Sequence, residues 1–180
     1  MINPNAACIK QEFSWFTTLV QARFAEYFEN QVAELKPSEL RPPDIANDSS
    51  PYASLVMKYK MGVDERIILL LALAPSIQPQ ILDVFLMENP TLNRIFTEFG
   101  GWQGKFHRGF LPTCETAVFI LGGDQLERRF EISRYFDASH FLVKDRIIDI
   151  DADIGSEPFF SRPLNVNAEF LESLDFGVAK

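Results

Sequence analysis

The chain has 180 residues, 47% of them hydrophobic and 13% aromatic, and this abundance of apolar side chains excludes an intrinsically disordered protein. With 25 acidic and 17 basic residues it carries a formal charge of −8, which disfavours a nucleic-acid partner because the overall field repels phosphates. The two cysteines are far apart in the sequence, so we expect free thiols and no disulfide. The sequence shows no leader-like start and no apolar stretch of about 20 residues, so we expect a cytoplasmic protein without membrane spans.

The first predicted element is a long amphipathic helix over residues 6–35, within an N-terminal segment 1–36. Its apolar residues recur every three or four positions, and many are aromatic. Such a stripe is expected to pack on its own domain, and packing on another subunit of a homo-oligomer is the alternative. The stripe consists of Ile9, Phe13, Phe16, Val20, Phe24, Tyr27, Phe28, Val32 and Leu35.

Residues 37–51 predict an extended connector, because four prolines in this segment prevent a continuous helix. We therefore expect a domain boundary near residue 51 and one compact domain over residues 52–180.

The most constrained element of that domain is a helix over residues 64–74. Asp64 and Glu65 suit the positive end of a helix, and Pro75 is expected to end it. The eight residues that follow Arg66, 67–74, are all apolar, so this helix is expected to be buried on every side. Further helices are predicted over residues 79–88 and, more briefly, 92–99.

Residues 100–104 contain three glycines and predict a loop. A helix is expected to follow, capped by Thr113 and ending at residues 122–123. Asp124 is expected to cap the next helix, which extends to Phe136 and contains Leu126, Phe130 and Ile132 among charged residues.

The hydrophobic period then changes to that of strands. Residues 141–143 and 147–150 predict two strands joined by a turn at 144–146, residues 159–160 a further short strand, and residues 167–174 a last helix. The predicted fold is therefore mainly α with a small β-hairpin. Helices followed by a hairpin are typical of a winged-helix-like domain, here preceded by the long N-terminal helix.

Two motifs resemble ligand-binding loops in part. Residues 100–106 have the glycines and lysine of a phosphate loop, but three residues instead of four separate the glycines and Phe106 replaces the Ser or Thr. Asp149, Asp151 and Asp153 alternate as in a calcium loop, but its glycine and its closing Glu are misplaced or missing. We interpret the first as a turn and the second as a strand with a solvated acidic face.

Catalytic and zinc-binding patterns are weaker still. His107, His140, Cys8 and Cys114 lack the short spacings of paired zinc ligands, and no G-x-S-x-G elbow occurs. Glu115 with His107 is conceivable as an acid–base pair, but a carboxylate at a helix start more often serves as a cap. No catalytic, cofactor-binding or metal-binding residue is predicted.

Three arginines of the helix 125–136, Arg128, Arg129 and Arg134, precede the predicted hairpin, where a DNA-binding winged helix places its recognition helix. Glu127 and Glu131 dilute their charge and are spaced to pair with arginines on the same helix. We favour a solvated, mixed-charge face and keep a DNA-binding module as the alternative function.

Residues 63–75 and 79–83 resemble the N-terminal winged-helix domain of certain bacterial AAA-family ATPases, including those encoded with phage-tail-like contractile injection particles. Residues 107–116 and 121–124 strengthen the similarity, which covers residues 52–176. The resemblance implies a domain that links a hexameric ATPase module to a partner or substrate. ATP, Mg²⁺ and their binding residues would belong to a downstream module, so we expect an N-terminal part of a longer protein or a relative without activity.

The predicted function is therefore a non-catalytic, protein-binding domain of an AAA-family ATPase. Its predicted surfaces are the loop 100–108 and the aromatic stripe of the first helix. Trp102 and Phe106 are the candidate anchors of that loop, because aromatic side chains dominate binding surfaces. The other candidate contacts are Lys105, His107 and Arg108.

Overall fold

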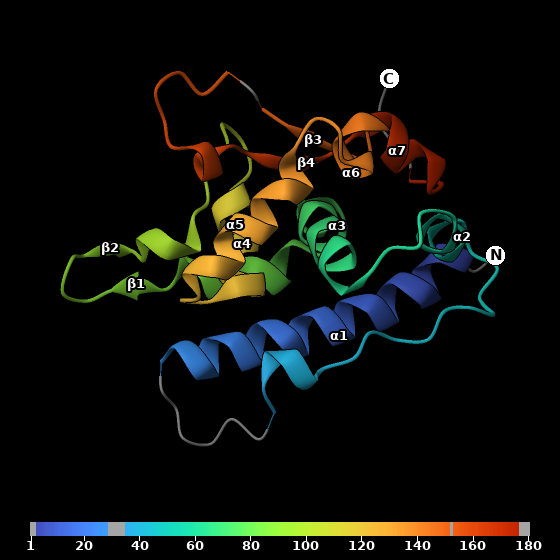
Figure 1. Ribbon diagram of the computed structural model, residues 1–180, viewed down its shortest axis with the longest axis horizontal. Coiled ribbons are helices and arrows are strands. Elements are labelled where there is room, and N and C mark those ends of the chain that lie inside the picture. The colour runs from blue at the N-terminus through green and yellow to red at the C-terminus, as the bar shows by residue number, and fades with distance from the viewer. Residues whose placement is uncertain (1–2, 29–34, 152, 177–180) are drawn as a thin grey trace. The chain divides into compact units, whose positions relative to one another are not determined.

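The computed structural model describes residues 3–28, 35–151 and 153–176. These residues are mainly helical, with two small antiparallel sheets of two strands each, and they begin with the long helix α1 (Pro4–Tyr27) (Figure 1). The predicted class, mainly α with a small β-hairpin behind a long N-terminal helix, is confirmed. The winged-helix resemblance stays a prediction.

The chain forms two compact units. The terminal unit comprises the described residues up to Leu70 and from Ala168 onward, and the central unit comprises Leu71–Asn167. The division falls inside α3 (Val63–Ile77), so it differs from the boundary expected near residue 51. The connector 37–51 belongs to the terminal unit, where Pro43 accepts a hydrogen bond from Arg66.

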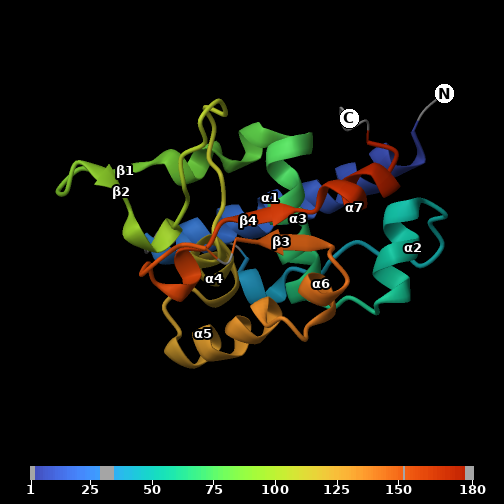
Figure 2. The ribbon, with the colours of Figure 1, turned by 90° about the horizontal axis from the view of Figure 1, so that it is seen from above.

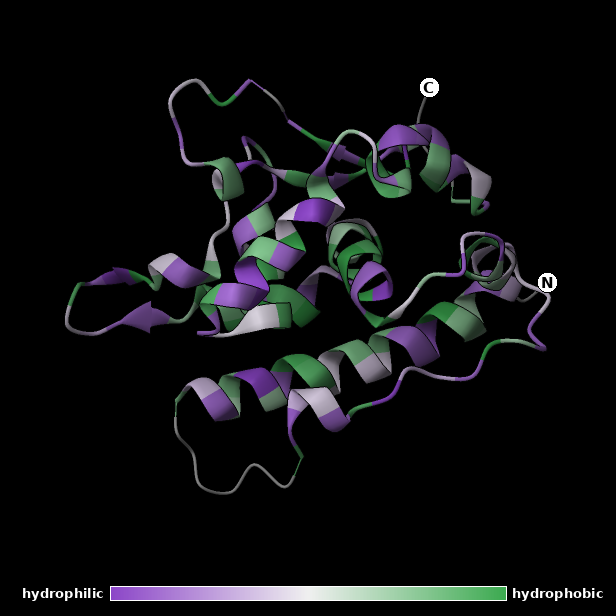
Figure 3. Cartoon of the chain, viewed as in Figure 1, coloured by the Kyte–Doolittle hydropathy of each residue, from purple (hydrophilic) through white to green (hydrophobic). Residues whose placement is uncertain are grey.

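Helix α1 starts where the side chain of Asn3 accepts a hydrogen bond from the backbone N–H of Asn5, with Pro4 in the first turn. Hydrophobic and hydrophilic residues are interspersed along this helix (Figure 3). The helix ends at Tyr27, and Leu35 is not helical, so the predicted extension to residue 35 is wrong there. Lys36, which precedes Pro37, is extended, as residues before proline usually are. Val32 lies outside the described residues.

The aromatic stripe of α1 is buried, as expected for a stripe that is part of a core. Phe28, at its C-terminal end, is 36% exposed. Formation of a homo-oligomer through this helix stays a prediction. The buried members are Ile9, Phe13, Phe16, Val20 and Phe24.

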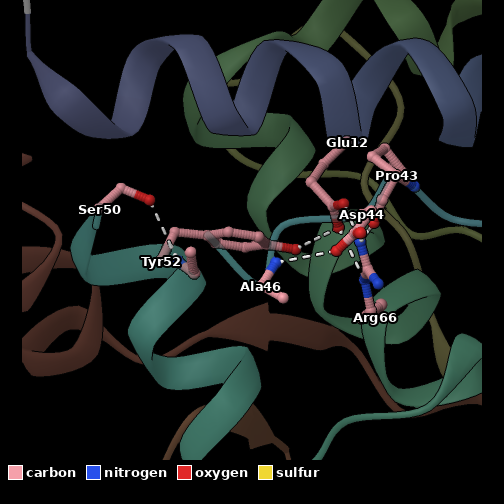
Figure 4. A network of polar contacts seen from close by, with 8 residues as sticks. Glu12, Pro43, Asp44, Ala46, Ser50, Tyr52 and Arg66 are labelled. Atoms are coloured by element: carbon pink, nitrogen blue, oxygen red, sulfur yellow. Dashed lines mark hydrogen bonds and ion pairs between the residues drawn. The ribbon is translucent and has the colours of Figure 1, made fainter. Parts of the chain in front are cut away.

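A buried polar network holds the terminal unit together (Figure 4). Glu12 of α1 is fully buried and forms an ion pair with Arg66 of α3, whose side chain is 8% exposed. The hydroxyl of Tyr52, in α2 (Pro51–Lys58), donates to the same carboxylate at 2.8 Å, and Arg66 also donates to the carbonyl of Pro43 at 2.9 Å. One carboxylate and one guanidinium thus join α1, α2, α3 and the connector.

A second buried side chain, Asn5, makes further links within the terminal unit. Its amide nitrogen donates to the carbonyl of Leu174 at 2.8 Å, just after α7 (Ala168–Ser173), and its amide oxygen accepts from the N–H of Tyr52 at 2.9 Å. Helix α7 confirms the helix predicted over residues 167–174. The short 3₁₀ helix η1 (Pro37–Glu39) starts the connector.

Helix α3 confirms the predicted all-round burial, because residues 67–74 are each at most 2% exposed. It continues through Pro75 to Ile77, so the expected stop is wrong. Proline at this point removes only one hydrogen bond near the end of the helix. The chain then bends by 104° into the 3₁₀ helix η2 (Pro79–Leu86), which replaces the predicted α-helix 79–88.

No single helix in the described ranges combines the length and apolarity of a membrane span. Among the described helices, only α3 and η2 together have the length and apolarity of a span, and they are bent by 104° relative to each other.

The predicted helix 92–99 is also wrong. Strands β1 (Glu88–Asn89) and β2 (Arg94–Ile95) form a small hairpin, followed by the 3₁₀ helix η3 (Thr97–Phe99). The side chain of Asn89 accepts from the N–H of Thr91 at 2.9 Å, and Asn93 has a φ of 52°. These turn conformations favour a hairpin over a helix at this point.

The next two helices are present largely as predicted. Helix α4 (Cys114–Gly122) is capped by Thr113, whose backbone N–H donates to the Thr116 hydroxyl at 3.1 Å. Helix α5 (Leu126–Ser133) starts after Gln125 instead of Asp124, and η4 (Arg134–Phe136) extends it.

The hairpin near the C-terminus contains the expected strand at residues 147–150 but pairs it with a different segment. Residues 141–143 lie in the helical turn α6 (Phe141–Lys144), and residues 159–160 lie in η5 (Phe159–Ser161). Strand β3 (Ile148–Ile150) pairs with β4 (Leu164–Val166), with Asp149 opposite Asn165. The His140 ring accepts from the N–H of Leu142 at 3.3 Å and so caps the turn that sequence alone assigned to a strand.

Candidate partner-binding surface

The predicted binding loop connects η3 with α4 in the central unit, and we call residues 100–111 the glycine loop (Figure 2). Two hydrogen bonds close its base. The N–H of Trp102 donates to the carbonyl of Leu111 at 3.0 Å, and the N–H of Gly101 donates to the hydroxyl of Thr113 at 3.1 Å. The capping residue of α4 therefore also anchors the loop.

Glycine is required where the loop starts. Gly100 has a φ of 64°, a conformation that L residues rarely adopt. A Cβ atom there would collide with the hydroxyl of Thr113 and would lie 3.0 Å from the backbone nitrogen of Thr116. The close approach of the loop to the start of α4 thus depends on the missing side chain.

We expect Gly100→Ala to lower the free energy of unfolding by about 1–3 kcal/mol, since it combines backbone strain with a steric clash. Gly155→Ala is the matched control, because Gly155 has a φ of 60° but nothing within 4 Å of the added Cβ. Urea denaturation followed by circular dichroism measures both. Equal losses in the two variants would show that the packing against Thr113 contributes nothing.

Aromatic packing fixes the end of the glycine loop. Phe110 is 3% exposed and stacks on Phe85 of η2, with ring centroids 5.0 Å apart. Phe85 also contacts Phe99 and Phe119 edge-on, at 5.9 and 6.2 Å. This four-ring cluster joins η2, η3, α4 and the loop, so the base of the loop is a part of the core.

The tip of the loop, in contrast, is exposed. Phe106 is 85% exposed, the highest value among the exposed large hydrophobic residues, and Trp102 is 38% exposed. The Lys105 nitrogen lies 5.3 Å from the centre of the Phe106 ring, and Arg108 is also exposed. Residues 99–114 include no acidic residue, so this surface is basic and aromatic in an acidic protein.

His107 is less exposed than the other four candidate contacts. Its Nε2 atom is buried, has no hydrogen-bond partner in the described part of the chain, and would lie 2.9 Å from a Cβ on Gly109. The ring therefore folds back over the loop. A hollow of about 540 Å³ lies beside it, lined by the loop together with Leu86 and Ile95.

The alternative DNA-binding residues are mostly engaged within the central unit. Arg128 pairs with Glu131 at 2.8 Å. Arg129 forms two hydrogen bonds with Glu115, at 2.6 and 3.0 Å, which raise the pKa of the Arg129 side chain. The paired carboxylates offset the positive charge of these two arginines, which weakens the attraction to a phosphate backbone. Arg134 is exposed.

Helix α5 also has an exposed apolar pair, which is not among the predicted binding residues. Leu126 is 62% exposed and Phe130 is 70% exposed, whereas Ile132 and Phe136 are buried. The helical period indicates this difference in burial, because residues 126 and 130 share one face of the helix and residue 132 lies on the opposite face.

Other predicted motifs have structural roles. Glu115 contacts Arg129, so no pairing with His107 is seen. The Asp149 carboxylate accepts from the side chain of Asn167 at 2.8 Å, and no group of three or more potential metal ligands is found among the described residues. Burial raises the pKa of the Cys114 thiol to about 12 and also raises the pKa of Cys8, so both are poor nucleophiles at neutral pH.

A scan against protein-family models and searches of curated proteins and solved structures found no match to this chain. The resemblance to the N-terminal domains of AAA-family ATPases therefore stays a prediction. The geometry of the exposed loop is the main structural support for a function.

Proposed function

We propose that this chain is a non-catalytic protein-interaction module that captures a protein partner with the tip of the glycine loop. The observation that carries the proposal is the 85% exposure of Phe106 on a loop whose base is held by hydrogen bonds and buried rings. A large exposed ring on a fixed base loses little conformational entropy when it binds. Such rings commonly act as interface anchors.

The charges around the ring define the partner surface. Lys105 and Arg108 flank Phe106, and residues 99–114 lack acidic side chains. The complementary surface is an apolar pocket with an acidic rim, since opposite charges steer association and reject wrong partners. Trp102 adds a second, less exposed apolar contact near the base.

The family resemblance supplies the proposed context. In this proposal the chain links a AAA-family ATPase to its partner or substrate in the bacterial cytoplasm, in a contractile injection system. ATP and Mg²⁺ act in the ATPase module, which this chain regulates or couples to the captured protein.

The proposal is tested by photo-crosslinking from the tip of the loop. A photoreactive phenylalanine analogue is placed at position 106 of the protein expressed in its host, and adducts are identified by mass spectrometry. We expect one dominant adduct, and we expect Lys105→Glu with Arg108→Glu to reduce its yield about tenfold or more because rim charges control association.

The same analogue at Thr91, in the exposed turn between β1 and β2, is the matched control. Equal adducts from positions 91 and 106, or none from 106, would overturn the loop as a binding surface. An adduct with a protein unrelated to any AAA-family ATPase or its substrates would retain the binding loop but overturn the ATPase context.

A further inference from the structure

A second hollow in the central unit has a different chemistry from the glycine loop. It has a volume of about 890 Å³ and lies between the turn 133–140 and the segment that holds Phe159 and Arg162. Ligand sites in proteins commonly have volumes of about 300–1,000 Å³. Arg134 lines the hollow from the turn 133–140, and Arg162 lines it from the other segment.

Arg162 is held in place by its backbone and by an aromatic ring. Its carbonyl accepts from the N–H of Cys114 at 3.0 Å, which fixes it beside the start of α4. Its guanidinium lies 4.5 Å from the centre of the half-exposed Phe159 ring. Its Nε atom is buried without a hydrogen-bond partner, and the side chain forms no ion pair within residues 3–28, 35–151 and 153–176.

Arg134 faces the same hollow and likewise lacks a carboxylate partner within the ranges that the structure describes. Arg128 and Arg129, on the adjoining helix, are both paired with glutamates. Among the described residues, Arg134 and Arg162, the two arginines that line the hollow, thus lack the carboxylate partners that Arg128 and Arg129 have. Guanidinium groups bind phosphates through several parallel hydrogen bonds.

Among the remaining groups of the hollow, Asp137 opposes an anion, so its charge has to be weighed against those of the two arginines. The carboxylate of Asp137 accepts from the N–H and the hydroxyl of Ser139, at 2.8 and 2.5 Å, and these bonds lower the pKa of Asp137. Both hydrogen bonds end on the same carboxylate oxygen, Oδ1 of Asp137. The Nδ1 atom of His140 accepts from Leu142, so its other nitrogen carries the proton when the ring is neutral. The lining therefore holds two permanent positive charges and one negative charge.

We infer that this hollow binds the phosphate group of a small phosphate ester between Arg134 and Arg162. Phe159 provides a flat apolar surface for the remainder of the ligand. A bare ion would fill little of the 890 Å³ volume, so an ester with an aromatic or planar group fits better than inorganic phosphate.

The inference is tested by titrating the whole chain, labelled with ¹⁵N, with adenosine monophosphate and with inorganic phosphate at constant ionic strength. We expect saturable shifts in the amide signals of residues 133–140 and 159–162, with the ester binding more tightly. Arg134→Gln and Arg162→Gln should each weaken binding about 10- to 100-fold, as expected for a hydrogen bond to a charged group. Arg162→Lys should retain part of the affinity.

Arg94→Gln is the matched control, because it removes the same charge from exposed strand β2, outside the lining of the hollow. Equal weakening by Arg94→Gln, or no saturable shift with either compound, would overturn the site. Binding of a short DNA duplex at low salt without binding of the ester would also overturn it, in favour of a nucleic-acid surface. If Arg162→Gln unfolds the chain, the test uses Arg134→Gln and Phe159→Leu instead. Unchanged affinity for the ester in both of these variants would overturn the site.

Discussion

Replacement of Glu12 by alanine is expected to lower the free energy of unfolding by about 3–5 kcal/mol, because it leaves the buried guanidinium of Arg66 without a counter-ion. Glu12 is fully buried, and its carboxylate is also the acceptor for the hydroxyl of Tyr52 at 2.8 Å. Burial and the nearby carboxylate hold the pKa of Tyr52 well above its ordinary value, so this hydroxyl remains a donor. The substitution therefore removes the acceptor of two buried donors at once.

Glu26→Ala is the matched control on the same helix. Glu26 pairs with Arg23 but is 49% exposed, so its removal should change stability by less than about 1 kcal/mol. The double replacement Glu12→Leu with Arg66→Met should recover much of the loss, since no charge is then buried alone. Urea denaturation measures all three variants. A loss in Glu12→Ala no larger than in Glu26→Ala would contradict the role of the buried pair.

Phe85→Ala is expected to destabilise the protein by about 3–5 kcal/mol, the range for truncating a buried aromatic residue. Phe85 is fully buried and contacts three rings, those of Phe99, Phe110 and Phe119. Its loss opens a cavity under the base of the glycine loop. We therefore expect partner capture to fail together with stability, which thermal unfolding and crosslinking measure in parallel.

Phe106→Ala is the matched control for that result. The same side chain is removed, but from a position that is 85% exposed, so stability should change by less than about 0.5 kcal/mol. Capture of the partner identified by crosslinking, measured for this variant by co-purification, should still fall strongly, because the anchor is gone. A similar loss of stability in both variants would show that Phe106 belongs to the core and would remove it as an anchor.

Several elements were predictable because their signals are local. The apolar run 67–74 requires burial on every side of a helix, and α3 has it. Thr113 suits an N-cap three residues before Thr116, and α4 begins there. The three glycines of residues 100–104 predict a loop, and the exposure of Trp102 and Phe106 is consistent with their selection as anchors.

Other predictions were wrong for two reasons: local side-chain contacts that hydrophobic periodicity does not reveal, and pairing between segments distant in the chain. Residues 141–143 are apolar enough for a strand, yet the capping His140 ring makes them helical. The partner of β3 is β4, across a connection of 13 residues, which short-range patterns do not identify. Residues 92–99 contain helical spacing, but the Asn89 turn and the left-handed conformation of Asn93 produce a hairpin.

The sequence by itself determined the helical class, the buried central helix and the place of the exposed loop, since propensity, capping and periodicity act over a few residues. Only the tertiary structure decided which charges meet between different elements. Tyr52 lies 40 positions and Arg66 lies 54 positions after Glu12 in the sequence, yet both side chains bind the Glu12 carboxylate. Arg134 and Arg162 likewise line the same hollow. Electrostatic contacts depend on distance in space, which chain separation does not encode.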